Sequence, residues 1–165
     1  MLRLLFFFCL SKGSVVQVEQ EVTPPEMLIL ERIPMYSKAD TYGNKNPYIQ
    51  VSTSGPRHPY TYSMIFNSGE LKKLSEYQNK TSTRYIRSPC CSTCEGKLDL
   101  PSSLKNLTLP LKPTLIRHIH STDVYSIVLV SCDEEPFQVS LRVSWLNSFG
   151  HVPAELFALI PVSFT

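Results

Sequence analysis

Apolar and polar residues alternate most clearly near the end of the chain, between Phe137 and Trp145. A period of two over this length predicts a strand with one buried face. Trp145, the only tryptophan, falls on that face, where we expect it to anchor the core. The preceding run, 124–132, is apolar on both faces, which predicts a central strand between two layers. Because only the polar break 133–136 separates the two segments, we expect them to pair as a β-hairpin.

Shorter segments of the same kind occur along the rest of the chain. Strands are predicted at 15–22, 27–33, 48–52, 60–66, 83–87 and 114–120, the first as an edge strand and the last beside the hairpin. Pro34 is expected to end the second of these strands. Only 68–77 has a helical spacing, with Leu71 and Leu74 on one face behind a cap at Ser68. The pattern therefore predicts an all-β, antiparallel β-sandwich with at most one short helix.

Composition and charge agree with a folded chain and narrow its partners. The 165 residues are 42% hydrophobic and 18% charged, which argues against a disordered chain. The net charge of +2 comes from scattered lysines and arginines. Since no basic stripe is interleaved with aromatic residues, nucleic acid is not expected as a partner.

The first 13 residues have the features of a secretory signal peptide. Arg3 precedes the apolar run 4–10, and Ser11 and Gly13 have the small side chains that a signal peptidase requires three residues and one residue before its cut. The run falls short of the roughly 20 residues that span a bilayer. The alternatives are a buried first strand or a start site inside a longer gene. We expect a signal peptide at 1–13 and a lumenal β-sandwich domain at 14–150.

Two glycosylation sequences are consistent with a lumenal location. Asn79 and Asn106 each begin an Asn-x-Thr sequence without proline at the middle position, in a polar and turn-like context. A glycan on either asparagine requires passage through the secretory pathway. The sequence therefore predicts a glycoprotein with sites at Asn79 and Asn106.

The cysteine count is even once the signal peptide is removed. Cleavage takes Cys9 and leaves four cysteines, which allow three pairings: Cys90, Cys91, Cys94 and Cys132. Adjacent Cys90 and Cys91 are poorly placed to bond each other. We therefore expect two disulfides, one of which joins Cys132 to a member of the group at 90–94. The sequence leaves open which member that is.

No motif for catalysis or cofactor binding stands out. The cysteine group with His118 and His120 could be combined into a zinc site, but the usual spacing of zinc ligands is missing. The Cys91-x-x-Cys94 segment lacks the helix and strand setting of a redox motif. Neither a nucleophile elbow nor a glycine-rich phosphate loop is present in the sequence. We therefore assign no catalytic, cofactor-binding or metal-binding residue, and expect no enzyme.

Part of the chain resembles a known family. Segments 124–132, 143–155 and 159–161 resemble the end of the lumenal domain in the GOLD-domain seven-transmembrane helix family, which includes the lung seven-transmembrane receptor group. The shared pattern is a strand led by Tyr125 and ending in Cys132, a strand ending in Asn147, then Gly150 and a short apolar approach to the first membrane helix. The vicinal Cys90 and Cys91 with Cys94 look like the plant and fungal-like branch. Ser148 and Phe149 depart from that branch and leave the subgroup open.

The resemblance implies a GOLD-like β-sandwich that faces the Golgi or endosome lumen and serves protein trafficking. Residues 151–165 would be the neck that leads to the first membrane helix. No apolar run of roughly 18 residues occurs in the chain, so the seven membrane helices are expected to be absent from it. The expected partner is a protein or a small lumenal ligand, with membrane contact only through the missing helices. The alternatives are a secreted β-sandwich enzyme or inhibitor, or a gene-model fragment without an independent role.

Overall fold

The computed structural model describes residues 15–22, 26–41, 43–54, 60–81, 89–90, 98–105, 109–110, 114–133 and 135–150. In chain order, the elements within these residues are β1 (Val15–Val22), β2 (Glu26–Met35), β3 (Tyr48–Ser54), β4 (Thr61–Phe66), α1 (Ser68–Thr81), β5 (Leu109–Pro110), β6 (Thr114–His118), β7 (Asp123–Ser131) and β8 (Phe137–Leu146). The expected signal peptide at 1–13, strand at 83–87 and neck at 151–165 lie outside the described residues.

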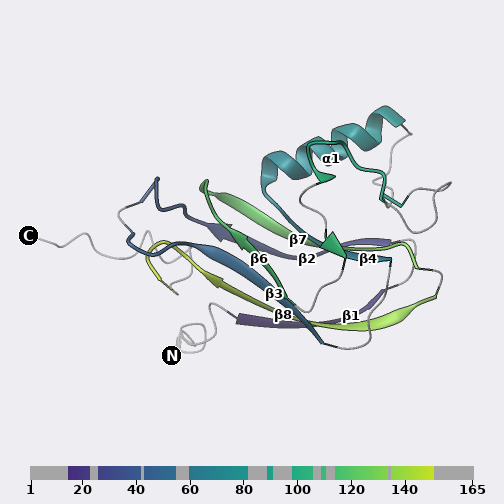
Figure 1. The fold of residues 1–165 in the computed structure, drawn as a ribbon, viewed down its shortest axis with the longest axis horizontal. Helices are drawn as coiled ribbons and strands as arrows, with labels where there is room; N and C mark the ends of the chain where they lie inside the picture. Colours follow the sequence, from purple (N-terminus) through teal and green to yellow (C-terminus); the bar gives the residue numbers. More distant parts are fainter. Residues whose placement is uncertain are drawn as a thin grey trace, which may run out of the picture.

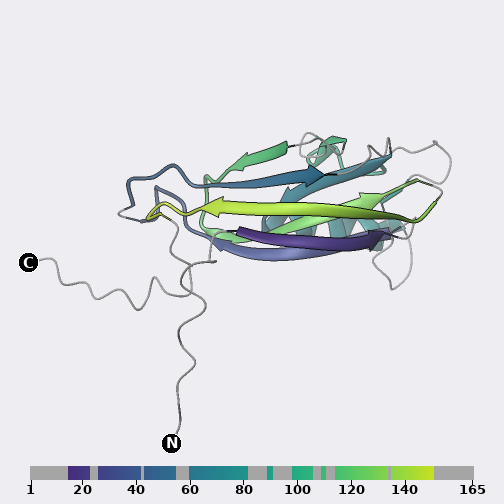
Figure 2. The same ribbon diagram turned by 90° about the horizontal axis from the view of Figure 1, so that it is seen from below.

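The strands form two antiparallel sheets that lie face to face, which confirms the predicted all-β sandwich (Figures 1 and 2). The first sheet, sheet A, has the order β1-β8-β3-β6, and the second, sheet B, has the order β2-β7-β4-β5. Helix α1 lies on the outer side of sheet B, against β7 and β4 (Figure 1). The middle strands of sheet B are thus covered on both faces, by sheet A on one side and by α1 on the other.

The predicted hairpin between the two most apolar strands is wrong. β7 lies in the middle of sheet B and β8 in the middle of sheet A, so the polar break between them carries the chain from one sheet to the other. The burial of each strand fits this placement: β7 is buried on both faces from Tyr125 to Ser131, whereas β8 alternates. β6 pairs with β3 rather than with either of these strands. The central position of 124–132 between two layers was predicted correctly.

The two outermost N-terminal strands close one side of the sandwich. β1 is an edge strand beside β8, as predicted. β2 is also an edge strand, but it continues through Pro34, which lies opposite Val124 in the register. An edge strand tolerates proline because the missing N–H is not needed where no further strand pairs. The register also shifts between Ile29 and Glu31, which marks a β-bulge.

The structure has two apolar clusters, one on each side of sheet B. The main cluster fills the space between the sheets and includes Tyr125, Ile127 and Leu129 of β7. The outer cluster lies between sheet B and α1, and its buried members are Met64, Phe66, Leu74, Leu100, Leu104, Val128 and Val130. Trp145 faces the main cluster but is only partly buried at its margin, so its expected role as a core anchor is weaker than predicted. The reason is its place near the end of β8, one residue past the last residue that pairs with β1.

Helix α1 begins with a capping box that the sequence pattern missed. The Glu70 N–H donates to Asn67 Oδ1 at 2.8 Å, and the Asn67 N–H donates to Glu70 Oε2 at 2.9 Å. Asn67 is therefore the cap, not Ser68 as predicted. The Ser68 hydroxyl instead donates to the Asp123 carboxylate at 2.6 Å, which ties the start of α1 to the start of β7.

An ion pair joins α1 to sheet A across the edge of the sandwich. Arg117 of β6 donates to both carboxylate oxygens of Glu70 at 2.8 Å, and both side chains are 19% exposed. The same guanidinium donates to the Ile65 carbonyl and lies 5.2 Å from the centre of the Tyr125 ring. Arg117 therefore contacts α1 and two strands of sheet B from a strand of sheet A.

Candidate functional site

An apolar hollow lies between α1 and the edge strand β2. We call it the α1–β2 groove. It has a volume of about 510 Å³ and is lined by Met27, Ile29, Arg32, Ser68, Leu71, Lys72, Leu74, Ser75, Val124 and Ser126. This volume falls within the range of small-molecule sites, roughly 300 to 1,000 Å³.

The groove exists because α1 covers only part of sheet B. The helix packs against β7 and β4 in the middle of the sheet, and β2 at the edge extends beyond it. Apolar residues on the outer face of β2 and at the start of β7 are therefore left partly open to water. Ile29 is 38% exposed and Val124 is 43% exposed. Leu71 and Leu74 supply the opposite wall from the helix.

The lining has two charged residues, Arg32 and Lys72, and both are cations. Arg32 of β2 and Lys72 of α1 are exposed, and neither the lining of β7 nor that of the helix includes a carboxylate. Lys72 reaches Glu76 at 3.9 Å, but both side chains of this pair are more than half exposed, which makes it a weak interaction. Arg32 forms no ion pair with any described residue. The groove therefore offers apolar contact with an excess of positive charge.

A second, more polar hollow lies at the end of β6. It has a volume of about 530 Å³ and is lined by Lys38, Ala39, Asn46, Pro47, His118, Ile119 and His120. His118 and His120 thus line the same surface hollow. No three histidine, cysteine or acidic side chains come together to hold a metal ion in the parts of the chain described above.

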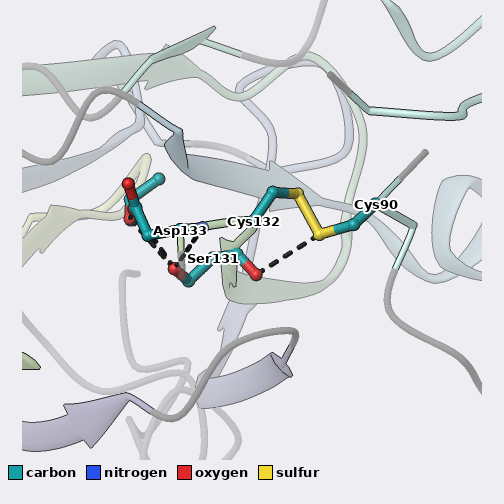
Figure 3. The surroundings of a disulfide bond; sticks show 5 residues. Cys90, Ser131, Cys132 and Asp133 are labelled. Atoms are coloured by element: carbon teal, nitrogen blue, oxygen red, sulfur yellow. Dashed lines mark hydrogen bonds between the residues drawn. A yellow bond between two sulfur atoms is a disulfide. The ribbon is translucent and has the colours of Figure 1, made fainter. Parts of the chain in front are cut away.

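A disulfide joins Cys90 to Cys132, which is one of the pairings that the sequence left open. It links the segment after α1 to the end of β7 (Figure 3). Both cysteines pack against the outer cluster. Cys90 Sγ lies 3.3 Å from the Ser131 carbonyl oxygen. Beside the bridge, Asp133 accepts hydrogen bonds from the hydroxyls of Thr61 and Ser131 at 2.6 and 3.3 Å. Cys91 and Cys94 lie outside the described residues.

The pKa values of Tyr62 and Asp40 differ from the ordinary values of a phenol and a carboxyl group. Burial raises the pKa of the Tyr62 phenol, and the Asp133 carboxylate adds to this rise. The Ser37 hydroxyl lowers the pKa of Asp40, and the hydroxyl and N–H of Thr122 lower it further. Neither group lines the α1–β2 groove. These two shifted pKa values therefore do not belong to residues of the groove.

The predicted glycosylation sites fall partly outside the described residues. Asn79 lies in the last turn of α1, and Asn106 is not described. The groove itself was missed by the sequence analysis. Its apolar wall was visible as part of an apolar strand at 27–33, but the pattern gave no sign that α1 would leave that strand uncovered. Arg32 and Lys72 belong to separate elements, so the sequence could not bring them together.

Comparison with known proteins gives one distant relative. No protein-family model matches the chain. The chain is 27% identical over 146 residues to an uncharacterized membrane protein of Schizosaccharomyces pombe, in a match that covers 78% of this chain and 32% of that protein. The chain therefore spans about a third of the length of this relative. Within the ranges that the structure describes, no helix has the length and apolar character needed to cross a bilayer.

A search of solved structures finds a weak likeness. The fold is similar to that of PliG, a periplasmic inhibitor of g-type lysozyme from Aeromonas hydrophila. The TM-score is 0.45 and the identity 11%, over 82% of this chain and 90% of that one. A likeness at this level carries no argument about the function of this chain.

Proposed function

We propose that this β-sandwich is a non-catalytic recognition domain of a membrane protein and faces the lumen of the secretory pathway, in the Golgi or endosomes. The observation that carries the proposal is the similarity to one third of a membrane protein. A sandwich of this size would be the part of such a protein that lies outside the bilayer. The resemblance of β7 and β8 to the lumenal domain of the GOLD-domain seven-transmembrane helix family supports the same role in trafficking or reception.

The disulfide supports a lumenal location. Cys90 and Cys132 are 42 residues apart in the chain and are joined in the structure. Disulfides persist in oxidising compartments and are rare in the cytosol, where thiols are kept reduced. A domain with this bridge in its outer cluster is suited to the lumen.

The groove supports recognition rather than catalysis. General acid–base catalysis needs ionisable groups that converge on a reacting atom, and histidine or carboxylate side chains supply them in most enzymes. The lining of the α1–β2 groove holds neither, and its two charged residues are Arg32 and Lys72. Such a lining can bind a ligand through apolar contacts and through attraction between opposite charges.

The location is tested with the full-length protein expressed in cells. We expect N-glycosidase treatment to increase gel mobility, and Asn79→Gln and Asn106→Gln each to remove one glycan. Asn44→Gln is the matched control, because Asn44 is exposed and lies outside a glycosylation sequence. Cys90 and Cys132 should react with maleimide only after reduction. A protein without glycans whose Cys90 and Cys132 react before reduction would face a reducing compartment, and the proposal would be wrong.

A further inference from the structure

We infer that the α1–β2 groove binds a small anionic amphiphile, a long-chain carboxylate. Its carboxylate would lie between Arg32 and Lys72, and its alkyl chain would lie along Met27, Ile29 and Leu74. This inference rests on the proposed function in one respect only, that the sandwich recognises a ligand without transforming it.

The positive charge lies toward one end of the groove. Arg32 is opposite Ser126 in the register of β2 and β7, three residues after Asp123. Lys72 lies about one helical turn beyond Ser68, whose hydroxyl is bound to Asp123. Both cations are therefore close to the start of β7, where α1 and β7 meet. Ser68 and Ser126 add hydroxyl groups to the lining at the same end.

Leu71 and Val124 lie at the charged end, and the other apolar residues of the lining extend away from it. Ile29 is opposite Val128 in the register, and Met27 is opposite Val130, so both lie farther along β7 than Arg32 does. Leu74 lies farther along the helix than Lys72 and is buried against the same strands. A charged end followed by an apolar channel has the same polarity as an amphiphile with one charged head and one alkyl chain.

The carboxylates near the charged end have other partners. Asp123 accepts hydrogen bonds from the N–H and hydroxyl of Ser68 and from the Val124 N–H. Glu70 is held by Arg117 on the other side of the helix start. Glu76 is the exposed partner of Lys72 at 3.9 Å, and an exposed pair of this kind is worth little against a competing anion. Because the lining itself holds these two cations and no carboxylate, an anionic head group is a better match for Arg32 and Lys72 than a neutral or cationic one.

The edge of β2 disfavours the competing occupant, an extended peptide. A peptide strand that adds to a sheet edge needs a regular row of free N–H and C=O groups. The bulge between Ile29 and Glu31 interrupts this row in β2, and Pro34 removes a donor from it. A ligand that fills the groove through side-chain contacts does not depend on that row.

The test uses the purified, oxidised chain and dansyl-labelled undecanoic acid as the fluorescent probe. We expect the probe to bind, and oleate below its critical micelle concentration to displace it. Methyl oleate has the same chain without the charge, so it should displace the probe less well, by up to about tenfold. The double variant Arg32→Gln/Lys72→Gln should weaken oleate binding by about tenfold and leave methyl oleate binding unchanged.

Matched variants on other surfaces serve as controls. Arg142→Gln/Lys73→Gln removes two exposed cations outside the groove and should leave oleate binding intact. Ile29→Glu should abolish probe binding, whereas Ile116→Glu, at a residue 51% exposed on the outer face of sheet A, should not. Equal binding of oleate and methyl oleate, or equal losses in the groove and control variants, would overturn the inference. The glycan and thiol assays do not depend on the groove, so they separate this failure from a failure of the proposed location.

Discussion

The outer faces of the two sheets differ in their exposure to water. On sheet A, Gln138 and Arg142 of β8 are exposed, and Ile116 of β6 is 51% exposed. On sheet B, Met64 and Phe66 of β4 are both 0% exposed beneath α1. Sheet A thus separates the main cluster from solvent, whereas sheet B lies between the main cluster and the outer cluster.

The difference explains why the groove is found on sheet B. A sheet with two apolar faces needs cover on both, and α1 is too narrow to cover all strands of sheet B. The middle strands β4 and β7 are covered, whereas on the edge strand β2 Met27 is only partly buried and Ile29 is 38% exposed. The α1–β2 groove is therefore the part of an apolar face that the helix leaves open.

The largest expected effect concerns the covered face itself. Phe66→Ala removes a fully buried ring from the outer cluster and should lower the free energy of unfolding by about 3 to 5 kcal/mol. Ile116→Ala is the control on the open face and should change it by no more than about 0.5 kcal/mol. Urea denaturation monitored by tryptophan fluorescence measures both. Similar losses in the two variants would show that the two outer faces do not differ in the way described.

The contrast between the faces was partly readable from the sequence. The alternation in 137–145 and the continuous apolar run in 124–132 correctly separated a strand with one buried face from a strand with two. Their pairing was not readable, because periodicity describes what a strand buries and not which strand lies beside it. A short polar break such as 133–136 can close a hairpin or carry the chain to the opposite sheet, and only the neighbours in the structure decide which.

The candidate site was less predictable than the fold. Arg32, Lys72 and Val124 come from three elements whose arrangement depends on where α1 settles on sheet B. That position is fixed by contacts far apart in sequence, such as Ser68 with Asp123 and Glu70 with Arg117. The disulfide was easier to predict from the sequence, because the cysteine count limited the possible pairings. Its exact partner required the segment after α1 to be placed beside β7.

The second prediction concerns the Cys90–Cys132 disulfide, which links the segment after α1 to the end of β7 in sheet B. Cys90→Ser/Cys132→Ser should lower the free energy of unfolding by about 2 to 4 kcal/mol, because the open chain regains the entropy of a long loop. Amide hydrogen exchange should quicken at β4, β7 and α1 more than at β1 and β8. Uniform quickening in both sheets would contradict a specific role of the bridge on the covered face.

The third prediction concerns the contact that joins the two regions. Arg117→Gln removes two charged hydrogen bonds to Glu70 and the contact with the Tyr125 ring, and should cost about 1 to 2 kcal/mol of stability. The matched control is Lys72→Gln, which breaks the exposed pair with Glu76 and should cost less than about 0.5 kcal/mol. Thermal denaturation of both variants and of Glu70→Gln measures these losses. An Arg117→Gln protein as stable as the control would show that the ion pair does not hold α1 to sheet A.

The smallest effect is expected at Asp40, which lies in the loop after β2 and on neither outer face. Its carboxylate accepts hydrogen bonds from the Ser37 hydroxyl at 2.6 Å and the Thr122 N–H at 3.1 Å, and these partners hold its pKa below the ordinary value. A lowered folded pKa means that the unfolded chain takes up the proton first as the pH falls. The stabilising contribution of Asp40 is therefore present above the ordinary carboxyl pKa of about 3.9 and is lost as the pH falls through the lower folded value.

Asp40→Asn should thus melt at a lower temperature than the unmodified chain near neutral pH, and the difference should shrink as the pH is lowered from about 5 to about 2. Glu135→Gln, at an exposed position before β8, is the control and should show no such convergence. Oleate binding in the groove should be the same in both variants at neutral pH, because Asp40 is not among the residues that line the groove. A melting difference that stays constant over this pH range would mean that the charge of Asp40 contributes nothing. The effect of Asp40→Asn would then come from the geometry of the loop alone.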